Sequence, residues 1–309
     1  MATIDLDKML EKVRDTQWAL DDFDWDKPGA DRISADQWPK LKAFMADLMW
    51  IEHVGARGFA ALAKKTPNDT LKELYTWFHA EEQRHANAEM ALMKRWGMLE
   101  HDDELPEPNI NIRLVIEWLD RYGDEMPLNA LASVIPMLEV ALDGALCKFL
   151  LDTVDDPLCH EVFKHINDDE ARHLGVGFTV MEMQGRSPLT LQWLRFIGTQ
   201  LDPRLILGIA AYFPLLNKMR DNLVELGLSE EKLYGAIDKF RKIGGRTAEG
   251  RRNPWYQMLW RHGAVMTNRK QRWYHRPVDA AVRVTDRIPA RLLPKTPSWV
   301  KELNANPLV

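Results

Sequence analysis

The chain has few cysteines and no long apolar run. Its two cysteines, Cys147 and Cys159, form no C-x-x-C pair, which excludes a disulfide framework and suits a reducing compartment. We expect both thiols to be small, buried and apolar in character. The longest apolar run, residues 205–216, has 12 residues, whereas a helix that crosses a bilayer needs about 20. The first ten residues, MATIDLDKML, are acidic and lack an apolar core, so we expect no signal peptide and a cytoplasmic protein.

Positive and negative charges nearly balance over the whole chain, but they are unevenly distributed along the sequence. The 309 residues carry a net charge of −5, ordinary for a soluble protein, and can form one large domain or two smaller ones. Residues 241–295 contain 14 Lys and Arg against three acids, which leaves about −16 on the rest. Such a region suits an anionic membrane surface, an acidic carrier protein or a ferredoxin, and equally the acidic remainder of the protein or a dimer mate. Five aromatic residues are interleaved with these bases: Trp255, Tyr256, Trp260, Trp273 and Tyr274.

Two short motifs carry the strongest chemical signal. WFHAEEQRHA contains Glu82 and His85, and NDDEARHL contains Glu170 and His173, in each case as Glu-x-x-His. Residues three apart lie on one face of a helix, so one carboxylate and one imidazole can reach the same metal ion. A single copy is a weak indication of a metal site, because exposed helix faces often contain this pattern.

Each motif has a glutamate upstream at a matching distance. Glu52 lies in LMWIEHVGA and Glu139 in IPMLEVALDGA. The step from Glu52 to Glu139 is 87 residues, and the step between the two motifs is 88 for both the glutamate and the histidine. This near-constant offset indicates a duplicated pair of helices. Four Glu and two His arranged in this way are the ligand pattern of ferritin-like di-iron and di-manganese bundles.

Helix start and stop signals place the ligands on four long helices. A capping box at Ser34–Gln37 precedes the first, Pro67 is expected at the first position of the second, and Pro136 should kink the third. Glu52 and Glu82 are equally far from the turn at Pro67, so the ligands of that hairpin come level across antiparallel helices. The expected helices cover residues 34–64, 67–96, 127–154 and 156–185.

The predicted fold class is all-α, a ferritin-like four-helix bundle with a long crossover and additional C-terminal helices. The crossover, residues 97–127, should contain one helix at IRLVIEWLDRYG. We expect residues 1–185 to form the bundle with an N-terminal extension, and residues 186–309 to form a helical extension packed on it, basic at its end. Residues 189–226 are strongly apolar and should be broken at Pro203 and Pro214, and a further helix is expected over 229–243.

Six titratable groups on inward faces would be costly to bury without metal. Oxygen-rich ligands with two imidazoles suit two Fe ions or a Mn/Fe pair, and open coordination positions would admit O2 as co-substrate. The alternative is a bundle whose buried carboxylates are satisfied without metal. The residues predicted to bind metal and to carry catalysis are Glu52, Glu82, His85, Glu139, Glu170 and His173.

Two acids adjacent to the motifs are candidates for orienting the histidines from outside the ligand set. They are Asp169 and Glu81, each directly before a ligand glutamate, and the alternative for each is a solvated acid. Among the other histidines, His165 is the one to check as an extra ligand, because it lies five residues before Glu170. We expect surface or packing roles for His53, His79, His160 and His165.

The motifs resemble those of a known superfamily. EEQRH and DDEARH are similar to the paired E-E-x-x-H and D-E-x-R-H motifs of ferritin-like di-iron carboxylate proteins. WFHAEEQRH resembles the corresponding helix of soluble acyl-carrier-protein desaturases, and INDDEARHLGVGF that of ligand-binding oxidases related to the ribonucleotide reductase small subunit. The resemblance covers about residues 40–184 and implies the same six ligands. No tyrosine stands near Glu139 on its helix, which weighs against a tyrosyl-radical or tyrosine-crosslinked oxidase, and the lack of rubredoxin-like cysteines weighs against rubrerythrin.

The function expected from these residues is that of a non-haem di-iron oxygenase or oxidase. A monooxygenase or desaturase acting on a small hydrophobic, fatty-acyl-like substrate, free or carrier-bound, fits Gly55 and Ala56 beside Glu52 and the apolar segment after residue 189. A ferredoxin or a reductase would supply electrons, and we expect a homodimer. The first alternative is a ferroxidase or metal-handling protein without organic substrate. The second is an interaction protein whose basic region docks on an anionic membrane surface, which would place it at the membrane periphery; no nucleic-acid motif is present.

Overall fold

A computed structural model describes residues 4–33, 38–99, 108–225, 230–266, 268, 272–285 and 287–292. Within these ranges it describes the backbone alone at residues 138, 140–149, 152, 153, 209, 213, 216, 219, 220, 222, 223, 225, 230, 232–234, 236, 266, 272, 285 and 290. Within these ranges every regular element is helical. The expected capping box at Ser34–Gln37, and the side chain of Cys147, lie outside the described part. Cys159 is fully buried, as expected of a small apolar residue.

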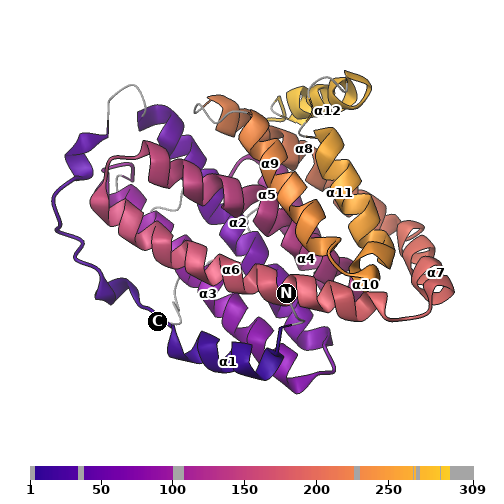
Figure 1. Cartoon of the computed structure of the whole chain (residues 1–309). Coiled ribbons are helices and arrows are strands. Elements are labelled where there is room, and N and C mark those ends of the chain that lie inside the picture. Colours follow the sequence, from indigo (N-terminus) through magenta and orange to yellow (C-terminus); the bar gives the residue numbers. More distant parts are fainter. Residues whose placement is uncertain are drawn as a thin grey trace.

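Four long helices form the centre of the molecule. They are paired as two antiparallel hairpins, α2 with α3 and α5 with α6, which pack against each other (Figure 1). The predicted all-α four-helix bundle is therefore confirmed, and the crossover between the hairpins contains the expected helix, α4 (Ile110–Tyr122). The bundle helices are α2 (Trp38–Lys65), α3 (Asp69–Arg95), α5 (Leu128–Thr153) and α6 (Pro157–Gly185).

The ends of these helices follow local capping chemistry. Asp156 caps α6 by accepting a hydrogen bond from the Leu158 backbone N–H (3.0 Å), with Pro157 at the first helical position, as predicted. The prediction for α3 was wrong by two residues. Asn68, and not the residue before Pro67, caps it by accepting from the Leu71 N–H at 2.7 Å. Asn68 is a better N-cap residue than Thr66, which would have capped a helix that began at Pro67.

The two hairpins make a close approach at Pro136. A Cβ atom at Gly177 of α6 would overlap the Pro136 ring on α5, so glycine is required there by helix packing. A Cβ atom at Gly55 of α2 would likewise overlap the carboxylate of Glu82. The small residue beside Glu52 therefore makes room for a ligand side chain.

The remaining helices surround the bundle. α1 (Leu6–Asp15) lies along α3 and α6, while α9 (Glu230–Gly244) and α11 (Pro254–Met266) pack on α5. Pro203 begins α8 (Pro203–Glu225), but the predicted break at Pro214 was wrong, because α8 continues through that residue. The other elements are α7 (Leu189–Gln200), α10 (Ala248–Arg252), α12 (Arg272–Thr285) and the 3-10 turns Leu20–Asp22, Ala30–Arg32, Gly123–Glu125 and Ala290–Leu292.

The described helices include none that is both long and apolar enough to cross a membrane. The division at residue 185 stays a prediction. In the basic C-terminal region, Trp255, Tyr256 and Tyr274 are buried, and Trp255 and Tyr256 pack into clusters shared with the bundle helices. Arg246 of this region forms an ion pair with Glu182 of α6 at 2.9 Å, so part of the basic charge is used within the protein.

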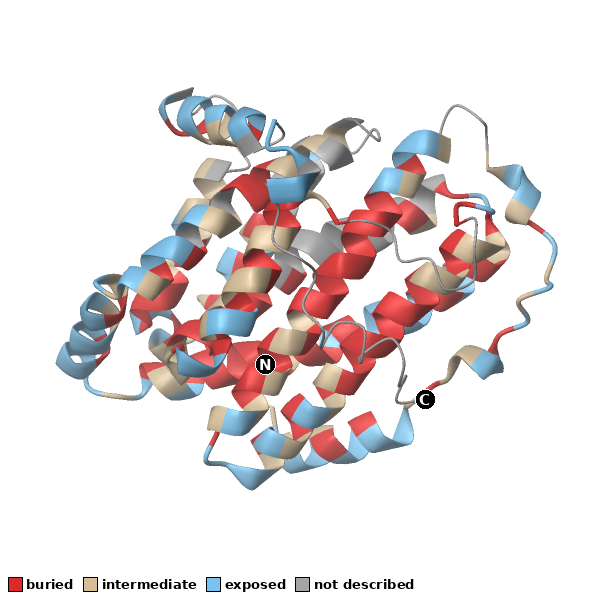
Figure 2. Cartoon of the chain, turned by 180° about the vertical axis from the view of Figure 1, so that it is seen from behind, coloured by how far each residue is buried: buried red, intermediate tan, exposed pale blue. Residues whose placement is uncertain are grey.

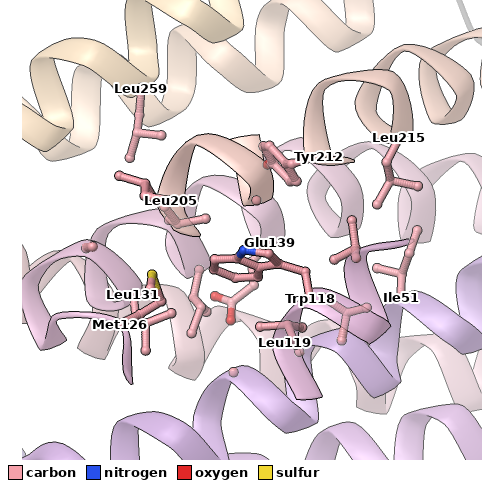
Figure 3. Close-up of a pocket in the computed structure, with 18 of the residues that line it drawn as sticks. Ile51, Trp118, Leu119, Met126, Leu131, Glu139, Leu205, Tyr212, Leu215 and Leu259 are labelled. Carbon is pink, nitrogen blue, oxygen red and sulfur yellow. The ribbon is translucent and has the colours of Figure 1, made fainter. Parts of the chain in front are cut away.

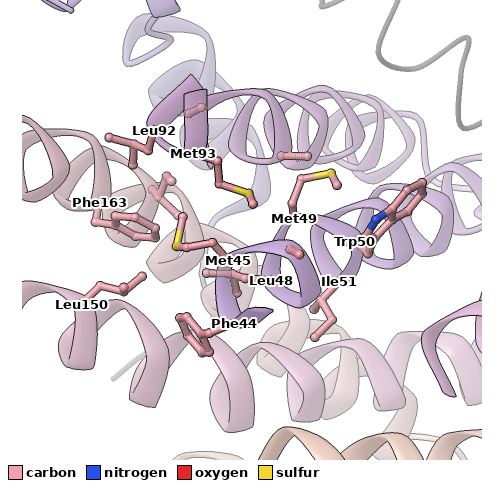
Figure 4. Close-up of a cluster of buried hydrophobic side chains, with 14 of the residues drawn as sticks. Phe44, Met45, Leu48, Met49, Trp50, Ile51, Leu92, Met93, Leu150 and Phe163 are labelled. Atoms are coloured by element: carbon pink, nitrogen blue, oxygen red, sulfur yellow. The ribbon is translucent and has the colours of Figure 1, made fainter. Parts of the chain in front are cut away.

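The bundle core consists of two apolar clusters separated along the helix axes. On α3, one cluster takes residues from 71–78 and the other from 86–93, and on α6 the corresponding stretches are 176–180 and 158–166. In Figure 2 the buried residues gather on the bundle helices at the centre of the molecule, and Figure 4 shows the second of these clusters around Met45 and Phe163. The predicted ligands lie between the two clusters, in a layer that water does not reach.

Candidate metal centre

The four bundle helices bring all six predicted ligands together. Every one of them is buried. Their ligand atoms form two groups of four, and within each group the atoms lie within 4.8 Å of one another. Glu82 and Glu170 belong to both groups, so they occupy the position of ligands shared by two metal ions. The groups are Glu52, Glu82, His85 and Glu170, and Glu82, Glu139, Glu170 and His173.

Both histidines direct the same ring nitrogen at the carboxylates. His85 Nδ1 lies 3.1 Å from Glu170 Oε1 and 3.5 Å from Glu52 Oε2. His173 Nδ1 lies 3.1 Å from Glu82 Oε1 and 3.4 Å from Glu170 Oε2. Each of the two groups thus receives one histidine nitrogen, as a pair of metal ions would require.

The outer nitrogen of each histidine is held by an acid from the other half of the duplication. His85 Nε2, on α3, pairs with Asp169 Oδ2 on α6 at 2.9 Å. His173 Nε2, on α6, pairs with Glu81 Oε2 on α3 at 2.8 Å. When Nε2–H donates to a carboxylate, the Nδ1 lone pair is left available for metal. The structure therefore places Asp169 and Glu81 beside the histidines, as the sequence suggested. The sequence did not suggest that each acid holds the histidine of the other motif.

Residues outside the predicted set complete this buried network. Arg172 donates to Glu81 at 3.0 Å and also to Asp169. Trp18 Nε1 donates to Asp169 Oδ2 at 2.8 Å, and the Arg84 guanidinium lies over the Trp18 ring at 4.6 Å from its centroid. The two arginines lie inside EEQRH and DDEARH, but nothing in those motifs indicates their place in the network. Trp18 lies in an irregular segment, and no periodicity or motif could have indicated it.

The other histidines stay outside the two groups. His53 is fully buried, and His79 Nδ1 is hydrogen-bonded to the Ala56 carbonyl at 2.8 Å. His160 Nε2 is hydrogen-bonded to the Val154 carbonyl at 2.6 Å. His165 lies on the exposed side of α6 and packs its ring against Trp18 and Phe23.

Comparison with solved structures identifies the architecture. Two R2-like ligand-binding oxidase variants with aerobically reconstituted Mn/Fe cofactors align with TM-scores of 0.58 and 0.55, at 17% and 16% identity. The alignments cover 80% and 86% of this chain and 94% of each oxidase. The chain has the ferritin-like fold. Neither a protein-family model nor a curated protein sequence matches it.

The electrostatics of this layer of carboxylates and histidines favour cation binding. Burial, with Glu170 and Glu52 nearby, raises the pKa of Glu82 well above its ordinary value, and burial with Glu170 does the same for the pKa of Glu139. For Glu170, burial raises the pKa, but His173 and His85 outweigh it and lower the pKa to about 2. Without metal, bound protons therefore neutralise the carboxylates in place of the metal ions.

Several polar atoms at the centre lack a protein hydrogen bond. Both oxygens of Glu139 and of Glu170, and Nδ1 of His85 and His173, make no hydrogen bond of normal geometry, although these side chains are buried and the Nδ1 atoms approach carboxylates to 3.1 Å. Buried polar atoms without partners are rare and costly. Because these orphaned atoms converge and are of the oxygen and imidazole type, the residues fit a pair of iron or manganese ions.

An apolar cavity of about 210 Å³ opens on one side of the ligands. Figure 3 shows the Glu139 carboxylate surrounded by Leu131, Trp118 and other apolar side chains. Glu52 and Glu82 also line it, and its wall on the opposite side comes from α8 and α11 of the C-terminal extension, through residues such as Leu205 and Leu259. Sequence reasoning anticipated an apolar C-terminal segment but could not place it over the metal site.

Replacing Asp169 with asparagine should weaken metal binding by roughly 10–100-fold, because His85 loses the charged acceptor that fixes its ring. Metal affinity measured by competition with a chromophoric chelator tests this. Asp168→Asn is the matched control, since Asp168 is the exposed neighbour on the same helix. Equal affinities in the two variants would show that Asp169 does not orient a ligand.

Proposed function

We propose that this protein is an O2-dependent dimetal oxidoreductase, using two Fe ions or a Mn/Fe pair, that oxidises a small apolar molecule or the apolar end of a longer one, such as a fatty-acyl chain. The observation that carries the proposal is the contact between the cavity and the ligand layer, where Glu52, Glu82 and Glu139 form part of the cavity wall. The R2-like oxidases of the same fold carry Mn/Fe cofactors, which supports a redox-active metal pair here.

The cavity can bind and orient such a substrate. Its volume is below the roughly 300–1,000 Å³ typical of drug-sized ligands, which suits a small molecule or a chain end. Apart from the three glutamates, the polar groups on its wall include Tyr212 and His262. Burial lowers the pKa of His262 to about 4, so that ring is neutral at pH 7 and adds no charge to the cavity.

The residues of the chain position the substrate and exclude water from the site of reaction. Reduced metal ions at the six ligands would donate the electrons that activate O2. Glu139 faces the cavity, so a C–H bond held among Leu131, Leu205 and Trp118 lies next to the ligand layer. The apolar walls exclude water, which strengthens electrostatic interactions at the site and limits side reactions. A ferredoxin or a reductase is the proposed electron source.

Filling the cavity tests the proposal. Ala130 is a buried cavity residue on α5, and Ala130→Phe should lower product formation at least about tenfold by occupying the substrate volume while leaving the metal content unchanged. The assay supplies reconstituted protein with O2, a chemical reductant and short-, medium- or long-chain fatty acids, and measures oxidised products by mass spectrometry. Ala280→Phe, at an exposed position on α12, is the control.

The alternative function is a ferroxidase without organic substrate. It would consume O2 in proportion to added Fe²⁺, form no oxidised organic product, and be unaffected by Ala130→Phe. That result would exclude the proposed oxidoreductase.

A further inference from the structure

The helix that follows the bundle exposes a large apolar face. α7 projects from the body of the molecule at the right of Figure 1, and the same segment is largely exposed in Figure 2. Six side chains on α7 and at its corner with α8 have exposed fractions of 43–73%. Large exposed apolar surfaces of this kind mark interaction sites. We call these residues the α7 patch: Trp193, Leu194, Ile197, Leu201, Ile206 and Leu207.

The charge around the α7 patch is mainly positive. Residues 186–207 contain Arg186, Arg195 and Arg204 against one acid, Asp202, which pairs with Arg204 at 2.7 Å, although the chain as a whole is acidic. Arg195 is exposed on the same helix as the patch. Aliphatic side chains and a tryptophan, flanked by arginines, are the composition of helices that lie in the interface of a bilayer with anionic lipids.

The α7 patch is connected to the cavity by packed aromatic rings. Trp193 contacts Phe196 with ring centroids 5.6 Å apart, and Phe196 contacts Trp255 at 5.0 Å. Trp255 lines the cavity. On α8, the cavity residue Leu205 directly precedes the exposed Ile206 and Leu207. Two short layers of side chains thus separate the exposed patch from the proposed substrate volume.

We propose that the α7 patch docks this protein on the surface of an anionic lipid bilayer. The arginines meet the headgroups, and the apolar side chains enter the acyl boundary. A second copy of the chain is the competing occupant, but a two-fold contact brings the same patch of both copies together and sets its arginines against each other, whereas an anionic surface attracts them. Docking in this orientation places the α8 and α11 wall of the cavity towards the lipid, from which an apolar substrate would come.

Vesicle binding of the full-length, metal-loaded protein tests the proposal. The probes are vesicles of phosphatidylcholine mixed with phosphatidylglycerol, and vesicles of phosphatidylcholine alone, with binding measured by co-sedimentation. The test variant is Leu194→Gln/Ile197→Gln/Leu201→Gln, which keeps Trp193 in place against Phe196. We expect it to bind the mixed vesicles at least about tenfold more weakly than the parent. The parent should bind phosphatidylcholine alone more weakly than the mixture.

A matched control distinguishes binding through the α7 patch from nonspecific binding through other exposed apolar side chains. Trp273→Gln/Val284→Gln/Leu292→Gln alters three side chains that are as exposed but lie in α12 and the 3-10 turn after it, and it should bind like the parent. Equal losses in both triple variants, or no binding by the parent, would overturn the proposal. A changed oligomeric state of the α7 variant with unchanged vesicle binding would assign the patch to a second copy. The measurement needs no turnover, so docking and the proposed function can fail independently.

Discussion

Replacing Glu170 with alanine is expected to abolish binding of the metal pair. Glu170 belongs to both groups of ligand atoms, and its oxygens lie 3.1 and 3.4 Å from the Nδ1 atoms of His85 and His173. The alanine variant therefore loses a ligand at both positions at once. Because loss of an outer hydrogen-bond partner alone costs roughly 10–100-fold in affinity, loss of a shared ligand should exceed that range. Glu139→Ala, which removes a ligand from one group only, should retain about one metal ion per chain.

The metal content after reconstitution, measured by elemental mass spectrometry, distinguishes these cases. Glu89→Gln is the control, because Glu89 is fully buried one helical turn beyond His85 but belongs to neither group. It should retain both ions. Full metal occupancy in Glu170→Ala, with helical content unchanged, would mean that the ions bind elsewhere. Equal loss in Glu139→Ala and Glu170→Ala would mean that the two positions do not fill independently.

Without metal, the protein should become less stable as the pH rises from about 5 to 8. The folded protein holds protons on Glu82 and Glu139, whose pKa values are raised well above 4.5, chiefly by burial. Burial lowers the pKa values of His85 and His173, but the surrounding carboxylates outweigh it and raise both well above 6.5. The unfolded chain releases these protons at lower pH. Each extra proton on the folded state therefore costs about 1.4 kcal/mol of unfolding free energy per pH unit.

Metal binding should reverse this dependence, because the ions displace the same protons and bind more tightly as the pH rises. The gain in unfolding temperature on metal addition should thus be larger at pH 8 than at pH 6, as measured by calorimetry. Glu139→Gln removes one of the protonated groups. The unfolding free energy of the metal-free variant should therefore fall less steeply with pH, by about 1.4 kcal/mol per pH unit, the contribution of one proton. A metal-free protein that gains stability between pH 6 and pH 8 would contradict the assignment.

That the six candidate ligands come together could be predicted because they obey two independent regularities in the sequence. Glu82 and His85 repeat after 88 residues as Glu170 and His173, and helical periodicity sets each pair on an inward face. The bundle helices followed from the same periodicity together with capping residues such as Asp156. Local chemistry was sufficient there because each signal acts within one or two turns of helix.

Features that depend on contacts between distant segments were not predictable in this way. Trp18 donates a hydrogen bond to Asp169, which is 151 positions away in the sequence, and Trp255 lines the same cavity as Glu52. Pro214 was expected to end a helix, but tertiary packing keeps α8 continuous through it. The exposed face of α7 is equally invisible in sequence, because an apolar helix of this length is more often buried.

The crosswise hydrogen bonds at the site also bear on how the duplicated halves depend on each other. The hairpin α2/α3 contributes His85 but lacks the acid that fixes it, and the hairpin α5/α6 contributes His173 but lacks the acid that fixes that ring. Neither hairpin alone can preorganise its own imidazole. An ancestral single hairpin would therefore have needed a second copy of itself to assemble the site, and in the present chain the two halves must dock before either imidazole is oriented to receive a metal ion.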